Sequence, residues 1–195
     1  MERLRSPNLR RMTHLRLVTD ADAEELTRLL VTSREFLAPF EPRREDSHFE
    51  LEFQRQVITA KLAAYESGSG VPFVIVEGGT IVGQLSLDRI EFGPYRSAEI
   101  GYWVAEHATG RGLATNSVAE ALDVAESELG LSRIVAATLP DNEPSMKVLR
   151  RSGFVEFGRA RSYMEIAGER RDHLMFERIL AEAVTGRDGE PDILR

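Results

Sequence analysis

Residues 99–115 read EIGYWVAEHATGRGLAT, and they contain a transition from a strand to a helix. The first six residues have the two-residue period of a strand, and both alternating sets are mostly bulky or apolar, which indicates a strand inside a sheet. After Gly110-Arg111-Gly112, apolar residues recur at helical spacing as far as Leu129. The first N–H groups of a helix have no intrahelical partner and that end is partly positive. We therefore expect an anion site at these glycines, most naturally for phosphate.

Length and composition predict one soluble domain. The chain has 195 residues, of which 42% are hydrophobic and 29% charged. We expect a domain over residues 13–181, between a loose arm at residues 1–12 and a polar tail at residues 182–195. No apolar run approaches the roughly 20 residues of a membrane helix, and no signal-peptide core follows the basic start. The expectation is a cytoplasmic protein without a membrane partner.

Charge and residue types exclude several classes of function. A net charge of −7 argues against a nucleic-acid partner, because such proteins present a basic face. The absence of cysteine excludes disulfides, thiolate zinc sites and a cysteine nucleophile. The four histidines lie at positions 14, 48, 107 and 173, which is no metal-ligand spacing. We expect no metal.

The remaining pattern predicts a mixed α/β domain. Strands are expected at residues 14–18, 71–77, 80–88, 99–104, 133–138, 154–166 and 171–179. Helices are expected from Asp20 or Asp22 to about Thr32, at residues 47–65 and 112–129, and from Asn142 to just before Gly153. Prolines should keep residues 36–42 out of a helix. The order predicts one mostly antiparallel sheet of about seven strands, flanked by about four helices, with one central crossover helix.

Two blocks of this sequence resemble a known family. Residues 107–115, HATGRGLAT, look like the acyl-CoA pyrophosphate loop of the GCN5-related N-acetyltransferases (GNAT). Residues 142–154, NEPSMKVLRRSGF, look like the second signature of that superfamily. This second block is similar to the branch that contains the ribosomal-protein N-terminal alanine and serine acetyltransferases. Both blocks stand in the expected order on the expected elements, and the resemblance covers roughly residues 15–179.

The chain departs from the family pattern at two positions. His107 stands where Gln or Arg is commoner, and it adds less positive charge beside a phosphate. Leu149 stands where many members carry a tyrosine that protonates the departing thiolate. The branch that this chain resembles commonly lacks that tyrosine too, and Ser145 is then the suggested substitute.

The resemblance implies direct transfer of the acetyl group from acetyl-CoA, the co-substrate, to an amine. Backbone N–H groups of residues 110–115 would hold the pyrophosphate, with Arg111 reaching a phosphate oxygen. The pantetheine arm would pair with main-chain groups of residues 103–105, and an N–H near Trp103 or Val104 would stabilise the oxyanion. Asn142 would bind the arm. The implied cofactor-binding residues are Trp103, Val104, Ala105, Gly110, Arg111, Gly112, Leu113, Ala114, Thr115, Asn142 and Ser145.

Two residues are candidates for proton transfer. An attacking amine must be neutral, so a base helps, and Glu99 lies on the strand that the resemblance places beside the cofactor. The alternative is that Glu99 is a solvated or salt-bridged strand residue. Ser145 is the candidate acid near the sulfur. Its alternative is a helix N-terminal hydroxyl that caps the helix or merely touches CoA.

The sequence leaves the acceptor open. The resemblance allows a protein N-terminal α-amine, a free amino acid or a small amine, with contacts from residues 34–44, 91–97 and 161–171. A different class of protein, a catalytically silent acyl-CoA-binding or regulatory domain, would have lost its proton-transfer groups, whereas Glu99, Ser145 and Tyr102 are present. The final strands offer an edge for a homodimer, which nothing in the sequence decides.

Overall fold

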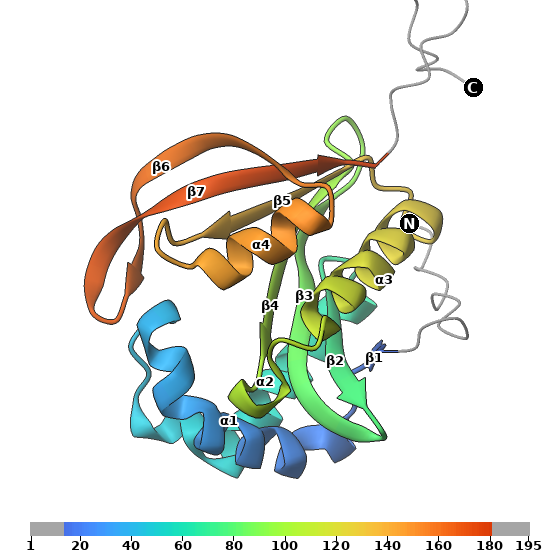
Figure 1. The fold of residues 1–195 in the computed structure, drawn as a ribbon. Coiled ribbons are helices and arrows are strands. Elements are labelled where there is room, and N and C mark those ends of the chain that lie inside the picture. Colours follow the sequence, from blue (N-terminus) through green and yellow to red (C-terminus); the bar gives the residue numbers. More distant parts are fainter. Residues whose placement is uncertain (1–13, 181–195) are drawn as a thin grey trace, which may run out of the picture.

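Residues 14–180, which the computed structural model describes, form one sheet of seven strands in the order β1-β2-β3-β4-β5-β7-β6 (Figure 1). The strands are β1 (Leu15–Leu17), β2 (Val71–Glu77), β3 (Thr80–Glu91), β4 (Ser97–Val104), β5 (Arg133–Thr138), β6 (Val155–Ile166) and β7 (Glu169–Ile179). The helices are α1 (Ala23–Leu37), α2 (Leu51–Glu66), α3 (Leu113–Ser127) and α4 (Glu143–Arg151). This confirms the predicted fold class. The expected arm and tail lie outside the described residues.

The parallel pair at the centre of the sheet determines its shape. β4 and β5 are parallel, whereas the other neighbouring strands pair antiparallel. Their register joins three residue pairs, from Ser97 opposite Arg133 to Glu99 opposite Val135. Beyond Glu99, β4 continues along β3 while β5 continues along β7, so the two strands diverge (Figure 1). We call the space between them the β4–β5 gap.

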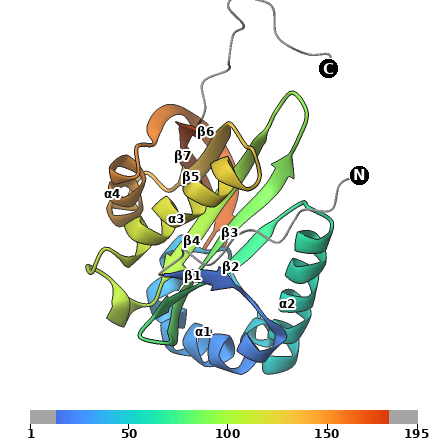
Figure 2. The ribbon, with the colours of Figure 1, turned by 90° about the vertical axis from the view of Figure 1, so that its right-hand side faces the viewer.

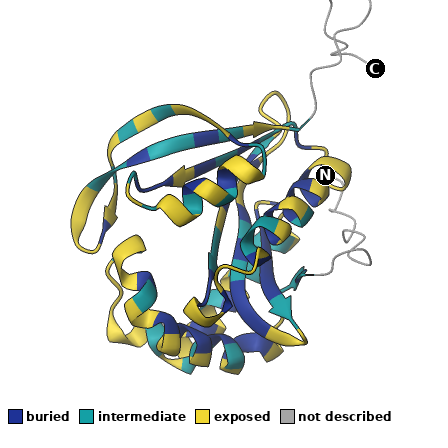
Figure 3. Ribbon diagram, viewed as in Figure 1, coloured by how far each residue is buried: buried dark blue, intermediate teal, exposed yellow. Residues whose placement is uncertain are grey.

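The helices cover the two faces of the sheet unequally. α3 packs on β1, β3 and β4, and α4 packs on β5, on the same face. α1 and α2 lie on the opposite face, against β2 and β3 (Figure 2). Strands β2 and β3 are therefore covered on both faces, which suits their largely apolar sequences. Burial follows this arrangement, because β2 is mainly buried while much of β6 is exposed (Figure 3).

A glycine fixes how closely β3 and β4 approach beside the gap. A Cβ atom on Gly83 would overlap the main-chain oxygen of Trp103, so no side chain is tolerated at this position. The adjacent Val82 accepts a hydrogen bond from the N–H of Ala105 at 2.8 Å. The sequence thus places the end of β4 tightly against β3, and this position orients its main-chain groups.

Two predicted helix boundaries were wrong. α1 does not end near Thr32 but continues through Phe36 to Leu37, and a 3₁₀ helix follows at Ala38–Phe40. Pro39 removes an N–H only from the turn that closes the helix, so residues 33–37 are free to remain helical. α2 begins at Leu51, because Glu50 is extended and residues 46–49 form a separate 3₁₀ turn.

Candidate active site

The gap-facing groups of β4 follow from the alternation of an antiparallel pair. In an antiparallel pair, residues whose N–H and C=O groups both bond to the neighbouring strand alternate with residues whose N–H and C=O groups point to the opposite side of the strand. Ala105 donates to Val82 on β3, and the oxygen of Trp103 lies toward Gly83 on β3. The main-chain groups of Tyr102 and Val104 therefore point into the β4–β5 gap. Both main-chain groups of Ala105 have partners inside the chain, because its C=O accepts from the N–H of Ala108 at 2.9 Å.

Side chains of β4 divide between the two faces of the sheet. Tyr102 packs against the core under α3 and α4, whereas Trp103 packs against the cluster under α1 and α2. Because successive strand residues point to opposite faces, Glu99 shares the face of Trp103. The candidate base and the Tyr102 phenol thus lie on opposite faces of the strand that borders the gap.

Ser145 is held at the first turn of α4, next to Tyr102. Asn142 is the N-cap of this helix, and its side-chain oxygen accepts from the N–H of Ser145 at 3.1 Å. The hydroxyl oxygens of Tyr102 and Ser145 are 3.2 Å apart, and the phenol also donates to the main-chain oxygen of Ser145 at 3.3 Å. Burial raises the pKa of Tyr102 to about 12, so its phenol stays protonated. Tyr102, Asn142 and Ser145 are therefore brought together.

Glu99 forms an ion pair with Arg89. One guanidinium nitrogen of Arg89 donates to both carboxylate oxygens, at 2.6 and 2.8 Å. The hydrogen bond to Glu99 and a weaker one to Tyr163 of β6 raise the pKa of Arg89. Arg89 lies in an irregular part of β3 with φ of 50°, opposite the start of β4. The ion pair matches the salt-bridged alternative for Glu99, while the side chain stays 42% exposed and accessible to an amine.

The glycine loop leads directly into α3. Gly112 is the N-cap residue with φ of 81°, a left-handed conformation that other residues adopt only with strain. Leu113, Ala114 and Thr115 then supply the first-turn N–H groups that have no partner within the helix. Arg111 pairs with Glu77 at the end of β2, with an N···O distance of 2.8 Å, and donates to the oxygen of His107. The arginine is thus turned toward the β2–β3 hairpin.

Two of the three segments expected to contact the acceptor meet. The loop after α1 and the β6–β7 turn are joined by a hydrogen bond from the N–H of Ala167 to the oxygen of Glu41, at 2.9 Å. The segment at residues 91–97 lies elsewhere, because Arg96 accepts from the N–H of Ser132 and donates to the oxygen of Gly130, beside the start of β5. That segment is therefore removed from the gap.

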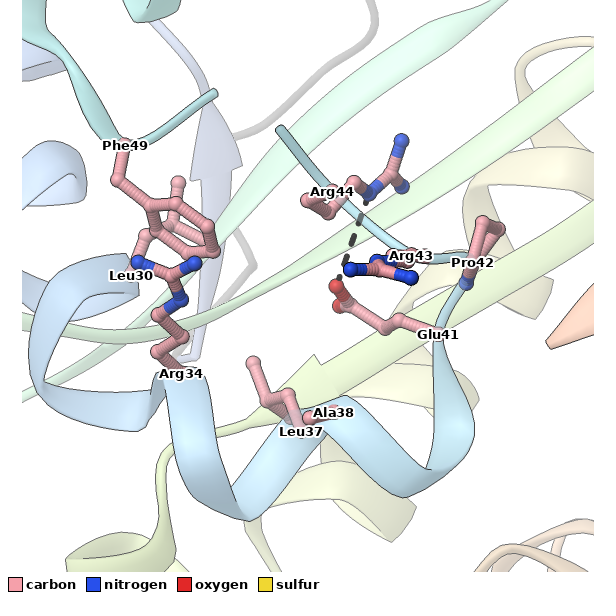
Figure 4. A pocket seen from close by; sticks show the side chains of 9 residues that line it. All are labelled: Leu30, Arg34, Leu37, Ala38, Glu41, Pro42, Arg43, Arg44 and Phe49. Atoms are coloured by element: carbon pink, nitrogen blue, oxygen red, sulfur yellow. Dashed lines mark ion pairs between the residues drawn. The ribbon is translucent and has the colours of Figure 1, made fainter. Parts of the chain in front are cut away.

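The loop after α1 encloses a pocket of about 170 Å³ (Figure 4). In Figure 4 the carboxylate of Glu41 points toward Arg44, and the guanidinium of Arg34 lies against the ring of Phe49, 4.3 Å from its centroid. Burial raises the pKa of Glu41, an effect that Arg44 partly offsets. The pocket is lined by Leu30, Arg34, Leu37, Ala38, Glu41, Pro42, Arg43, Arg44 and Phe49.

Sequence reasoning missed the contact of Arg89 with Glu99 and the hydrogen bond between Arg89 and Tyr163. Arg89 lies in the part of β3 where the alternation is broken, and Tyr163 comes from a strand that is distant in sequence. The signal for Tyr102 was available, since it alternates with Ile100 and Val104 on the core face. Within residues 14–180, no three His, Asp or Glu side chains gather as a metal site would require, and no helix is long and apolar enough to cross a membrane.

A sheet whose central parallel strands diverge beside a glycine-led helix end defines a protein of the acyl-CoA-dependent acyltransferase class. The chain belongs to the GNAT acetyltransferase family, whose model, described as "Acetyltransferase (GNAT) domain", matches residues 13–155. It falls in the branch of RimJ- and RimL-like ribosomal-protein N-acetyltransferases.

Three relatives illustrate this placement. The chain is 34% identical over 162 residues to "Probable N-acetyltransferase YjcK" of Bacillus subtilis, covering 82% of this chain and 90% of that protein. It is 28% identical over 163 residues to the "[Ribosomal protein uS5]-alanine N-acetyltransferase" of Escherichia coli, covering 83% and 84%. The solved structure of Mycobacterium smegmatis RimJ in complex with CoA-disulfide is 36% identical, has a TM-score of 0.82, and covers 85% of this chain and 80% of that one.

These findings establish the reaction. The chain is an acetyl-CoA-dependent N-acetyltransferase, which confirms the predicted enzyme over the catalytically silent alternative.

Proposed function

We propose that this enzyme acetylates the α-amine at the N-terminus of a protein by direct attack on acetyl-CoA in the β4–β5 gap. The observation that carries the mechanism is the placement of Glu99 and the Tyr102–Ser145 pair on opposite faces of β4. An amine that enters on one face then meets a carboxylate, and the sulfur that leaves on the other face meets hydroxyl groups.

The choice of acceptor follows from relatives and from chemistry. The printed name of the E. coli relative states that it acetylates an alanine of ribosomal protein uS5. An α-amine has a pKa of roughly 7.7 to 8.0 against about 10.4 for lysine, so much more of it is neutral near pH 7.5. Such an acceptor needs only modest help from a base, which suits a carboxylate that is already paired with Arg89.

The donor would lie along β4 and against α3. The N–H groups of residues 110–115 would hold the pyrophosphate, and Arg111 would exchange Glu77 for a phosphate oxygen. The pantetheine arm would pair with the gap-facing groups of Tyr102 and Val104. The same alternation favours the N–H of Val104 over that of Trp103 for the oxyanion. Asn142, whose oxygen is used by Ser145, would donate its amide N–H to the arm.

The acceptor chain would enter between the loop after α1 and the β6–β7 turn. These segments are joined at Glu41 and Ala167, and the loop after α1 lines the pocket of Figure 4. The pocket presents one partly desolvated carboxylate and the guanidinium groups of Arg43 and Arg44. This mixture fits a peptide backbone with polar side chains better than it fits a purely cationic amine.

A thiol-release assay with acetyl-CoA tests the acceptor. We expect turnover with peptides that begin with Ala or Ser, and much slower turnover with free amino acids, polyamines and aminoglycosides. A reversed order of rates would refute the protein acceptor while leaving the acetyltransferase itself intact.

The role of Glu99 is tested by Glu99→Gln, with Glu91→Gln, an exposed residue at the end of β3, as the matched control. We expect Glu99→Gln to lower kcat about 10- to 100-fold at pH 7 with little change in the KM for acetyl-CoA. The defect should narrow above about pH 8, where the α-amine is already neutral. An unchanged pH–rate profile would remove Glu99 from the mechanism.

A further inference from the structure

We propose that Tyr102 is a positioning residue for Ser145, whose hydroxyl proton it directs toward the sulfur of CoA. The inference rests on the proposed place of Ser145 near the sulfur and adds a partner to it. Position 149 of α4 supplies no hydroxyl for this purpose, because Leu149 is fully buried on the core face of the helix. The hydroxyl that contacts Ser145 comes from β4 instead.

The geometry allows two arrangements of two protons. The single phenolic proton has two acceptors, the main-chain oxygen of Ser145 at 3.3 Å and its hydroxyl oxygen at 3.2 Å. When the phenol donates to the main-chain oxygen, the Ser145 hydroxyl donates back to the phenol. When the phenol donates to the hydroxyl oxygen, the Ser145 proton is free to turn toward the gap. Negative charge on a sulfur in the gap selects the second arrangement.

The surroundings hold this pair in place. Asn142 fixes the main chain of Ser145 through the capping hydrogen bond, and the ring of Tyr102 packs against the core under α3 and α4. Burial raises the pKa of Tyr102 to about 12, so the phenol keeps its proton wherever an amine can attack. A thiol has a pKa of about 8.5, so its thiolate leaves with hydrogen-bond donors alone and needs no strong acid.

The step balances without a further reactant. The amine nitrogen forms the bond to the carbonyl carbon, the carbon–sulfur bond breaks, and its electron pair stays on sulfur. The nitrogen loses one proton to Glu99 or water, and that proton balances the thiolate. Tyr102 and Ser145 keep their protons and donate hydrogen bonds throughout.

The first test needs no acceptor. The dissociation constants of CoA and of desulfo-CoA, which lacks the thiol, are measured between pH 7 and 9 for the wild type, Tyr102→Phe, Ser145→Ala and the double variant. Donors aimed at the sulfur stabilise the thiolate, so the wild-type preference for CoA should grow about tenfold over this range. Each single variant should lose most of that growth. An exposed tyrosine variant, Tyr95→Phe, is the control and should behave as wild type.

The second test is a double-mutant cycle on kcat, with any amine that the wild type acetylates. We expect Ser145→Ala to lower kcat about 30-fold and Tyr102→Phe about tenfold, with the KM for acetyl-CoA nearly unchanged. The double variant should be no slower than Ser145→Ala, because Tyr102 acts through Ser145. If Tyr102→Phe melts too low to assay, Tyr102→Met replaces it and keeps the apolar bulk.

The outcomes separate this inference from the proposed acceptor. Additive losses in kcat, or a Tyr102→Phe protein that keeps the pH-dependent preference for CoA, would overturn the role of Tyr102. Absence of turnover with peptides would refute the acceptor alone, since CoA binding still decides the role of Tyr102.

Discussion

The two halves of the sheet differ in how they are covered. The covered half, strands β1 to β4, has α3 on one face and α1 with α2 on the other. The open half, strands β5, β7 and β6, has α4 on one face, and much of β6 is exposed (Figure 3). On the other face of this half, the side chain of Phe157 is 47% exposed. Phe73 on β2, by contrast, is fully buried.

This difference matches the two substrates. The elements proposed to hold acetyl-CoA, the end of β4 and the start of α3, belong to or adjoin the covered half, where dense packing fixes main-chain positions. The β6–β7 turn proposed to contact the acceptor belongs to the open half, whose free face leaves room for a protein chain. In this proposal, the donor is positioned and the acceptor gains access at different parts of one sheet.

The largest effect should come from removing a buried ring in the covered half. We expect Phe73→Ala to lower the free energy of unfolding by about 4 kcal/mol, because the substitution leaves a cavity in the core. Phe157→Ala in the open half should cost less than about 1 kcal/mol, since its ring already contacts solvent and the guanidinium of Arg133. Urea unfolding of the two variants measures both values.

Equal losses of stability for Phe73→Ala and Phe157→Ala would contradict the division of the sheet into a covered half and an open half. A large loss for Phe157→Ala in particular would mean that another copy or another segment covers the open face in solution. Repeating the measurement at several protein concentrations separates these cases, because only association makes stability depend on concentration.

An intermediate loss of stability is expected on replacing aspartates whose pKa values are lowered in the folded protein. In the covered half, burial alone would raise the pKa of Asp22, but hydrogen bonds from Arg16 and Thr19 outweigh it. In the open half, hydrogen bonds from Ser162 and then Arg159 lower the pKa of Asp172. We expect Asp22→Asn to cost about 2 kcal/mol at pH 7 and Asp172→Asn to cost much less, because water competes for its partners.

The pH dependence has a defined sign. A carboxyl group whose pKa is lowered by folding stabilises the fold above its unfolded pKa of about 3.9, and this stabilisation is lost as pH falls through the folded pKa. The difference between wild type and Asp22→Asn should therefore be full at pH 7 and shrink below about pH 4. Thermal unfolding across this range measures it, and a difference that persists at pH 2.5 would assign the effect to packing.

The sequence predicted those features that depend on local pattern. The β2–β3 hairpin, the bounds of β5, and the position of α3 follow from turn residues and periodicity within a few neighbouring residues. The helix boundaries failed where Pro39 acted one turn later than expected and where Glu50 became extended. Local rules place a proline or a cap, but packing decides how far a helix reaches toward it.

Contacts between segments that are distant in sequence could not be predicted from local patterns. β7 inserts between β5 and β6, and Tyr163 of the edge strand β6 nevertheless interacts with Arg89 of β3. No periodicity encodes such a pairing, because the register of a long hairpin against β5 is decided by side-chain packing across the sheet. The juxtaposition of Tyr102 and Ser145 was nearer to prediction, since each position pointed to the same core.

The smallest loss of stability is expected at the glycines that flank the two ends of α3, and the same two positions test the donor site. Gly112 before the helix and Gly130 after it have φ of 81° and 63°, and a Cβ at either position would meet open space. Alanine at either glycine should therefore cost about 1 kcal/mol of stability through left-handed strain alone. Only Gly112→Ala should also weaken CoA binding, by about tenfold, because its Cβ would stand in the space where the pyrophosphate approaches the first-turn N–H groups.

Calorimetric titration of CoA measures this loss. Equal losses of affinity for both variants would show that the strain acts through the whole helix, and would contradict a local contact between Gly112 and the pyrophosphate.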